Sequence, residues 1–164
     1  MPSTYTPIAT TTLGSAASTV TFSSISSAYT DLILIATPQS ASGTTSLDIQ
    51  FNGDTGTNYS LTYLYGDGSG AYSGRASNNA VANGGTAVST ASTFLVNTVQ
   101  IMNYSNTTTY KSLLTRANNT AGNVLTSVSM WRNTAAISTI LLKLASGTNF
   151  TTGSTFTLYG VKSA

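Results

Sequence analysis

The sequence predicts an all-β protein with a jelly-roll-like antiparallel β-sandwich and an extended N-terminal arm. Short runs in which apolar and polar residues alternate recur along the chain, and this period-2 pattern is typical of half-buried strands. Clusters of Gly, Asn, Asp and Ser separate the runs, as turns between short strands require. We find no segment with sustained apolar periodicity of 3.6 residues. About nine strands fit a sandwich, and the eight-stranded jelly roll matches that number best.

The 164-residue chain has the length of one domain and begins with a polar segment, residues 1–17, that is rich in Thr, Ala and Ser. Pro2 and Pro7 lie in this segment, and nothing in it predicts a helix. We therefore expect an extended arm over 1–17 and a single sandwich domain over 18–164. A polar arm of this kind commonly lies along its own sheet or on a neighbouring subunit.

The first half of the chain contains four predicted strands, at 20–22, 30–37, 46–51 and 58–65. The second of them is apolar on both faces, as expected for a central strand, and Pro38 ends it. The third places Leu47, Ile49 and Phe51 on one face, which we expect to point into the core. The Asn-Gly-Asp stretch that follows predicts a hairpin loop before the fourth strand.

A Gly-, Ala-, Ser- and Asn-rich region, residues 66–92, comes next. An irregular loop of this length is uncommon in a compact domain, so the region is functional, partly stranded or used in assembly. Strand patterns then resume at 93–103, 109–116, 124–131, 137–145 and 154–162.

The composition excludes several kinds of chemistry. The chain has no His, no Cys and no Glu, and only 6 % of its residues are charged. Catalytic triads that need His or Cys are therefore impossible, and we expect neither an enzyme nor a bound cofactor. Six scattered basic residues form no stripe, so we expect no nucleic-acid binding. We also expect no signal peptide and no membrane-spanning segment.

Two of the four acidic residues lie in or beside the hairpin loop after the third strand. Asp48, Asn52 and Asp54 are hard oxygen donors that a cation such as Ca²⁺ prefers. The spacing does not match a calcium-binding loop, so we regard them as weak candidates for metal ligands and expect no metal. Asp48 and Asp54 are also the carboxylates that a glycan-processing enzyme would need, an interpretation we disfavour. The simpler interpretation is a turn in which Asp54 accepts nearby backbone N–H groups.

Aromatic side chains offer a second candidate site. Tyr59, Tyr63, Tyr65, Tyr72 and Trp131 have the spacing of a sugar-stacking platform, but core packing or a subunit contact also explains period-2 aromatic residues. Arg132 follows the tryptophan and would pair with an aspartate or lie over an aromatic ring. We favour packing for the aromatic residues and a structural role for Arg132 over ligand binding.

The chain resembles small virion structural proteins of tailed bacteriophages, especially those of marine cyanobacterial phages. The segments that carry the resemblance span nearly the whole chain: MPSTYTPIATTTLGS, TVTFSSISSAYTDLILIAT, LDIQFNGDTGTNYS, MNYSNTTTYKSLLTR, MWRNTAAISTILLKL and NFTTGSTFTLYGVK. The resemblance implies a component of the virion and brings no catalytic role with it.

The expected function is therefore a head decoration (cement) protein on the capsid exterior. It would act as a homotrimer that clamps the major capsid protein or other virion subunits through many weak, symmetric contacts. The length of the chain favours this interpretation, because receptor-binding tips are often fused to long fibre shafts. The alternative is a tail-fibre or receptor-binding protein that recognises a glycan of the host surface through the aromatic residues and the 66–92 region.

Overall fold

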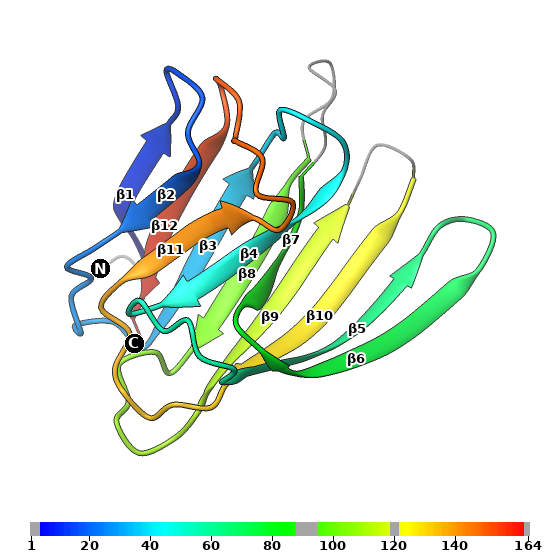
Figure 1. The fold of residues 1–164 in the computed structure, drawn as a ribbon. Helices are drawn as coiled ribbons and strands as arrows, with labels where there is room; N and C mark the ends of the chain where they lie inside the picture. Colours follow the sequence, from blue (N-terminus) through cyan, green and yellow to red (C-terminus); the bar gives the residue numbers. More distant parts are fainter. Residues whose placement is uncertain (1–3, 88–94, 119–121, 163–164) are drawn as a thin grey trace.

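The computed structural model describes residues 4–87, 95–118 and 122–162. These residues form two antiparallel sheets that face each other, with the first and last strands of the chain side by side (Figure 1). None of the described residues lies in a helix that could cross a membrane. The strands are β1 (Tyr5–Thr12), β2 (Thr19–Phe22), β3 (Asp31–Thr37), β4 (Thr45–Phe51), β5 (Tyr59–Gly66), β6 (Ala71–Asn79), β7 (Ala82–Ala87), β8 (Asn97–Met102), β9 (Lys111–Asn118), β10 (Val124–Trp131), β11 (Ile140–Leu144) and β12 (Thr155–Val161).

The strand order identifies the topology. The larger sheet runs β1-β12-β3-β8-β9-β10-β5-β6, and the smaller sheet runs β2-β11-β4-β7. Without the hairpins β5–β6 and β9–β10, eight strands remain in two sheets of four, with the first and last strands side by side. Successive strands of this set of eight alternate between the two sheets, except that β4 and β7 lie in the same sheet. This connectivity is the double Greek key of a jelly roll. The predicted jelly-roll-like antiparallel sandwich is confirmed.

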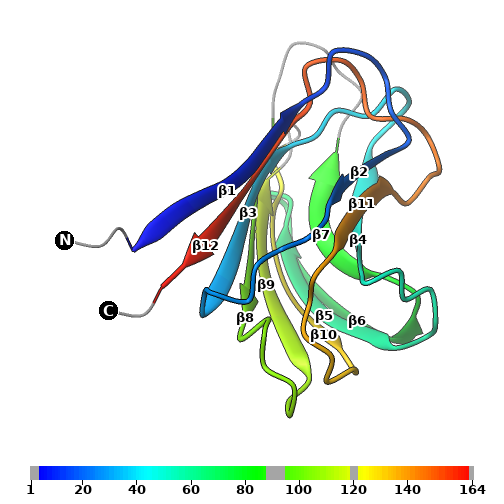
Figure 2. The ribbon, with the colours of Figure 1, turned by 90° about the vertical axis from the view of Figure 1, so that its left-hand side faces the viewer.

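Two hairpins enlarge one sheet beyond its partner. The β5–β6 hairpin is inserted between β4 and β7, and the β9–β10 hairpin is inserted between β8 and β11. Both are added to the β8 edge of the larger sheet. The β5–β6 hairpin consequently extends past β7, on the right in Figure 1, and the larger sheet curls there in the side view of Figure 2. Strand β6 is exposed along nearly its whole length.

The N-terminal segment is part of the larger sheet. Residues 5–12 form its edge strand β1, which pairs antiparallel with β12 and is bulged between Pro7 and Ala9. The lone proline and the bulge are common features of edge strands. The region 66–92 also contains regular structure, because it holds β6 and β7. Of the alternatives for that region, the partly stranded one is correct.

The core lies between the sheets and follows the period-2 pattern. Leu47, Ile49 and Phe51 have no exposed surface, which confirms their predicted inward orientation. Their main partners on the facing and neighbouring strands are also fully buried: Leu32, Leu34, Val99, Ile101, Leu113, Ile140, Leu142, Phe156 and Leu158.

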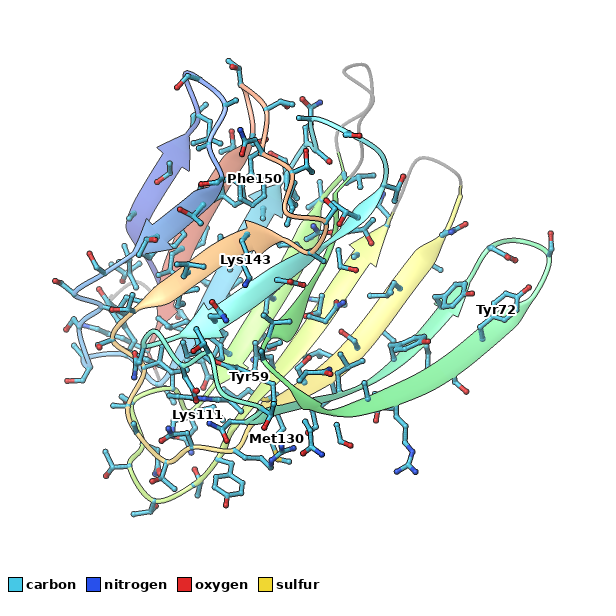
Figure 3. The ribbon with its side chains drawn as sticks, in the orientation of Figure 1. Tyr59, Tyr72, Lys111, Met130, Lys143 and Phe150 are labelled. Atoms are coloured by element: carbon cyan, nitrogen blue, oxygen red, sulfur yellow. The ribbon has the colours of Figure 1, made fainter. Side chains whose placement is uncertain are left out.

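One buried side chain is charged. Lys111 has no exposed surface, and its Nζ donates to the carbonyl oxygens of Thr109 at 2.8 Å and Thr134 at 3.0 Å. Burial lowers the pKa of this lysine, because the charged form loses water. The side chain links the loop before β9 to the loop after β10, on the inner side of the lower end of the sandwich (Figure 3).

Candidate functional site

The loop between β4 and β5 is a tight turn closed by backbone bonding. The Asp54 N–H donates to the Phe51 carbonyl oxygen at 2.8 Å. Asn52 and Gly53 have φ angles of 51° and 70°. Positive φ at both central positions defines a type I′ turn, for which Asn-Gly is the preferred pair. The predicted turn is confirmed, but the predicted hairpin is wrong: β4 belongs to the smaller sheet and β5 to the larger one, so the turn leads the chain from one sheet to the other.

The Asp54 side chain stabilises the β4–β5 loop by accepting hydrogen bonds from three donors. Its carboxylate accepts the indole N–H of Trp131 at 2.7 Å, the Asn58 amide at 2.9 Å and the Gly56 N–H at 2.9 Å. Desolvation acts to raise the pKa of Asp54, but these three donors outweigh it and hold the pKa below the usual value. The carboxylate therefore shapes the loop and orients Trp131, as the turn interpretation expected.

The other two weak metal candidates have different partners. Asn52 donates to the Ala136 carbonyl oxygen at 2.8 Å and accepts the N–H groups of Ser138 and Thr139. Asp48 pairs in register with Lys143 of β11, on the outward side of the smaller sheet. In the described ranges, no group of three or more His, Cys, Asp or Glu side chains is placed to hold a metal ion. The structure does not bring Asp48, Asn52 and Asp54 together as one set of ligands.

Asp48 is the carboxyl group with the most unusual titration. Partial burial raises its pKa to about 6, and the nearby charge of Lys143 opposes this shift (Figure 3). Since the folded state binds this proton more tightly than the unfolded state, the free energy of unfolding falls as pH rises from 4 to 6. We expect a loss of about 1 kcal/mol over this range, because partial contact with water reduces the effect.

Urea unfolding at pH 4, 5, 6 and 7 measures this loss. Asp48→Asn is expected to remove the decrease and to be more stable than wild type at pH 7. Asp67→Asn is the matched control: backbone donors at Ser69 and Gly70 lower the pKa of Asp67, so its titration falls below this pH window. A wild-type protein whose stability rises from pH 4 to pH 6 would contradict the assignment.

The aromatic candidates separate into two groups. Trp131 and Tyr59 are buried, and the Trp131 ring lies 5.4 Å from Phe51 and 6.3 Å from Tyr59. Trp131 is therefore a core residue, and its inclusion in a sugar-stacking platform is wrong. Tyr59 also accepts the Phe51 N–H at 3.0 Å, and burial raises its pKa to about 12.

Tyr63, Tyr65 and Tyr72 do come together. Continuing along β5 on the face of Tyr59, Tyr63 and Tyr65 are half-buried, and Tyr72 of β6 is opposite Tyr65. The ring centroids of Tyr63 and Tyr65 are 6.2 Å apart, and those of Tyr65 and Tyr72 are 4.7 Å apart with the planes at 19°. The three rings form a row on the part of the sheet that extends past β7.

Arg132 has a structural role. Its guanidinium donates to the Thr57 carbonyl oxygen at 2.7 Å and to the Asn78 amide oxygen at 3.1 Å. These bonds hold the β4–β5 loop against the end of β6. The guanidinium therefore binds neutral oxygens, and the predicted pairing with an aspartate or an aromatic ring is wrong for the described part of the chain.

A pocket that the sequence did not suggest adjoins the tyrosine row. It has a volume of about 250 Å³ and lies between the two sheets at the end of β4. Tyr65 and Leu125 provide its apolar lining. The remaining lining residues carry hydroxyl or amide groups: Thr44, Thr45, Ser46, Thr86, Asn118 and Asn123. The eight lining residues come from five separate segments of the chain, so no local sequence motif predicts the pocket.

The outer face of the larger sheet forms a second unpredicted surface. Ile35, Leu64, Val124, Val128 and Met130 all point to this side, and between 37 % and 64 % of each side chain is exposed. Met130 marks this surface at the lower edge of Figure 3. The surface is hollowed by two grooves of about 500 and 550 Å³, one beside Val128 and Met130 and the other beside Leu64 and Val124.

Comparisons with known proteins add no relative. A scan of the sequence against protein-family models and a search of curated proteins each found no match. The two surfaces described above are thus the basis for assigning a function.

Proposed function

We propose that this protein is a non-catalytic structural component of a bacteriophage virion and that it binds other virion subunits through the outer face of its larger sheet. The observation that carries the proposal is the group of exposed apolar side chains on that face, Ile35, Leu64, Val124, Val128 and Met130. Several exposed apolar side chains on one face of a domain mark an interaction site. The sequence resemblance to phage virion proteins supports the nature of the assembly.

The chemistry of this face defines the partner. Each Å² of apolar surface removed from water contributes about 25 cal/mol, so a broad sheet face with several exposed apolar side chains favours a broad protein surface over a small ligand. Arg75 and Arg116 project from the same face, in register with Thr62 and Thr126. The complementary surface is therefore an apolar patch with carboxylates opposite the two arginines.

The proposed position is the capsid exterior, where the protein decorates the head as a homotrimer bound to the major capsid protein. The jelly-roll fold occurs in viral capsid domains and in lectins, and fold alone does not choose between them. A tail position is the alternative, and the copy number distinguishes the two. Hundreds of copies in each particle indicate decoration of the head, and about a dozen indicate the tail.

Incorporation into particles tests the docking face. We expect Leu64→Lys and Val128→Lys to reduce the amount of this protein in purified virions at least tenfold, because a buried lysine at the contact costs several kcal/mol. The measurement is quantitative mass spectrometry of virions assembled with each variant. Thr21→Lys is the matched control, since Thr21 is exposed on the smaller sheet. Normal incorporation of both outer-face variants would exclude this surface as the docking face.

A further inference from the structure

The row of Tyr63, Tyr65 and Tyr72 lies on the opposite face of the larger sheet from the exposed apolar surface. Tyr72 is 45 % exposed and stands on the hairpin that extends past the smaller sheet (Figure 3). Gly74 leaves room for the Tyr63 ring, because a Cβ at this position would lie 2.4 Å from the Tyr63 hydroxyl oxygen. The Tyr63 ring therefore packs directly on the backbone of Gly74, and the three tyrosine rings also contact one another.

The neighbouring pocket supplies the complementary polar groups. Tyr65 belongs to both features, since it stacks on Tyr72 and also lines the 250 Å³ pocket. The other lining residues are Leu125 and six residues with hydroxyl or amide side chains, and no lining residue carries a charge: Thr44, Thr45, Ser46, Thr86, Asn118 and Asn123. Since liquid water occupies about 30 Å³ per molecule, a pocket of about 250 Å³ has the size of a small polar ligand such as one sugar ring.

We propose that the tyrosine row and this pocket form a binding site for a neutral glycan. The C–H face of a pyranose carries partial positive charge and stacks on the electron-rich face of an aromatic ring. Sugar hydroxyls both donate and accept, and they match the hydroxyl and amide groups of the pocket. A carboxylated or sulfated sugar finds no cation in the pocket lining, so the site selects against anionic glycans. One sugar residue of the glycan enters the pocket beside Tyr65, and the sugar residues on either side of it lie along Tyr72 and Tyr63.

The rings of this site project away from the proposed docking face, although Tyr65 and Tyr72 also border the groove beside Leu64 and Val124. The tyrosines and the apolar side chains Leu64 and Val128 alternate on neighbouring strands and therefore project to opposite sides of the sheet. A subunit bound to a particle through its outer face leaves the tyrosine row open to solvent. Loss of glycan binding and loss of virion incorporation are consequently separate results that arise from different variants.

The test is an array of neutral and anionic oligosaccharides probed with the intact protein, followed by calorimetric titration of the neutral oligosaccharide that binds best. We expect Tyr72→Ala and Tyr65→Ala each to weaken binding at least tenfold. Tyr65→Phe retains the ring and is expected to bind within threefold of wild type. Thr45→Leu, which adds bulk on the inward face of β4 without removing a ring, is also expected to abolish binding. Tyr110→Ala is the control, because Tyr110 is at least as exposed as Tyr72 but lies in the β8–β9 loop.

Thermal melting of each variant verifies folding before its affinity is compared. Three results would overturn the proposal: no glycan on the array binds, only anionic glycans bind, or Tyr72→Ala and Thr45→Leu bind the neutral oligosaccharide as tightly as wild type.

Discussion

Trp131→Ala is expected to lower the free energy of unfolding by about 4 kcal/mol, the largest effect of any single substitution considered for this protein. The side chain is 1 % exposed and contacts the rings of Phe51 and Tyr59, so its removal leaves a cavity where β4, β5 and β10 meet. It also leaves the Asp54 carboxylate without its shortest hydrogen bond. Val128→Ala on the same strand is the control and is expected to change stability by less than about 0.5 kcal/mol, because Val128 is exposed in the free protein.

A double-mutant cycle isolates the hydrogen bond from the packing. Trp131→Phe keeps an aromatic ring but removes the indole N–H, and Asp54→Asn replaces the charged acceptor. We expect a coupling energy of about 1–2 kcal/mol at pH 7, measured by urea unfolding. Because the folded-state pKa of Asp54 is lowered, this contribution is present above pH 4 and is lost as pH falls through the lowered value. Additive effects of the two substitutions would show that the bond contributes nothing to stability.

The sequence predicted the turn after β4 well because the determinants of the turn are local. Asn52 and Gly53 specify the turn by their tolerance of positive φ, and Asp54 bonds within four residues of itself to Gly56 and Asn58. The inward pattern of Leu47 and Phe51 is equally local, since it depends only on alternation along one strand. The partnership with Trp131, 77 residues away, was not predicted, because no local pattern encodes which strands meet.

Strand β10 shows why the sequence did not predict the exposed apolar side chains on the outer face of the larger sheet. Its inward side carries Ser127 and Ser129, which are buried, and its outward side carries Val128 and Met130. The usual rule of apolar inside and polar outside is thus reversed over part of the strand. Ser129 accepts the Asn83 N–H of β7 at 3.2 Å, so the inward polarity is satisfied by the facing sheet. The signal in the sequence was a strand with apolar residues on both faces, which resembles an ordinary buried strand.

The strands in region 66–92 could not be predicted from the sequence for a related reason. Strand β7 has the sequence ANGGTA, which carries almost no apolar side chain and reads as a loop. It is nevertheless a core strand: Ala82 has no exposed surface, and Gly84 lies so close to Ile49 that a Cβ there would be 2.9 Å from the isoleucine side chain. Gly84 leaves room for side chains of the neighbouring strand β4, and Gly85 leaves room for Asn97 of the larger sheet. The need for these glycines depends on neighbours that only the folded structure reveals.

Gly85→Ala is accordingly expected to lower the free energy of unfolding by about 3 kcal/mol. Two costs combine at this position. Its φ of 111° is unfavourable for any residue with a Cβ, and that Cβ would lie 2.6 Å from the buried side chain of Asn97. Asn97 cannot move away freely, because its amide donates to the Thr86 carbonyl oxygen at 2.7 Å.

Gly68→Ala separates the two costs. Gly68 has a φ of 83°, but no atom lies within 4 Å of the position that an alanine methyl group would take there, so only the backbone cost of about 1 kcal/mol applies. Urea unfolding of both variants should therefore show a difference of about 2 kcal/mol, which measures how tightly β7 is held against the larger sheet. Equal effects would mean that β7 can shift outward without cost, and the pocket beside Thr86 and Tyr65 would then lack a rigid wall. A large difference instead places the pocket between two sheets whose spacing is fixed, as a preorganised binding site requires.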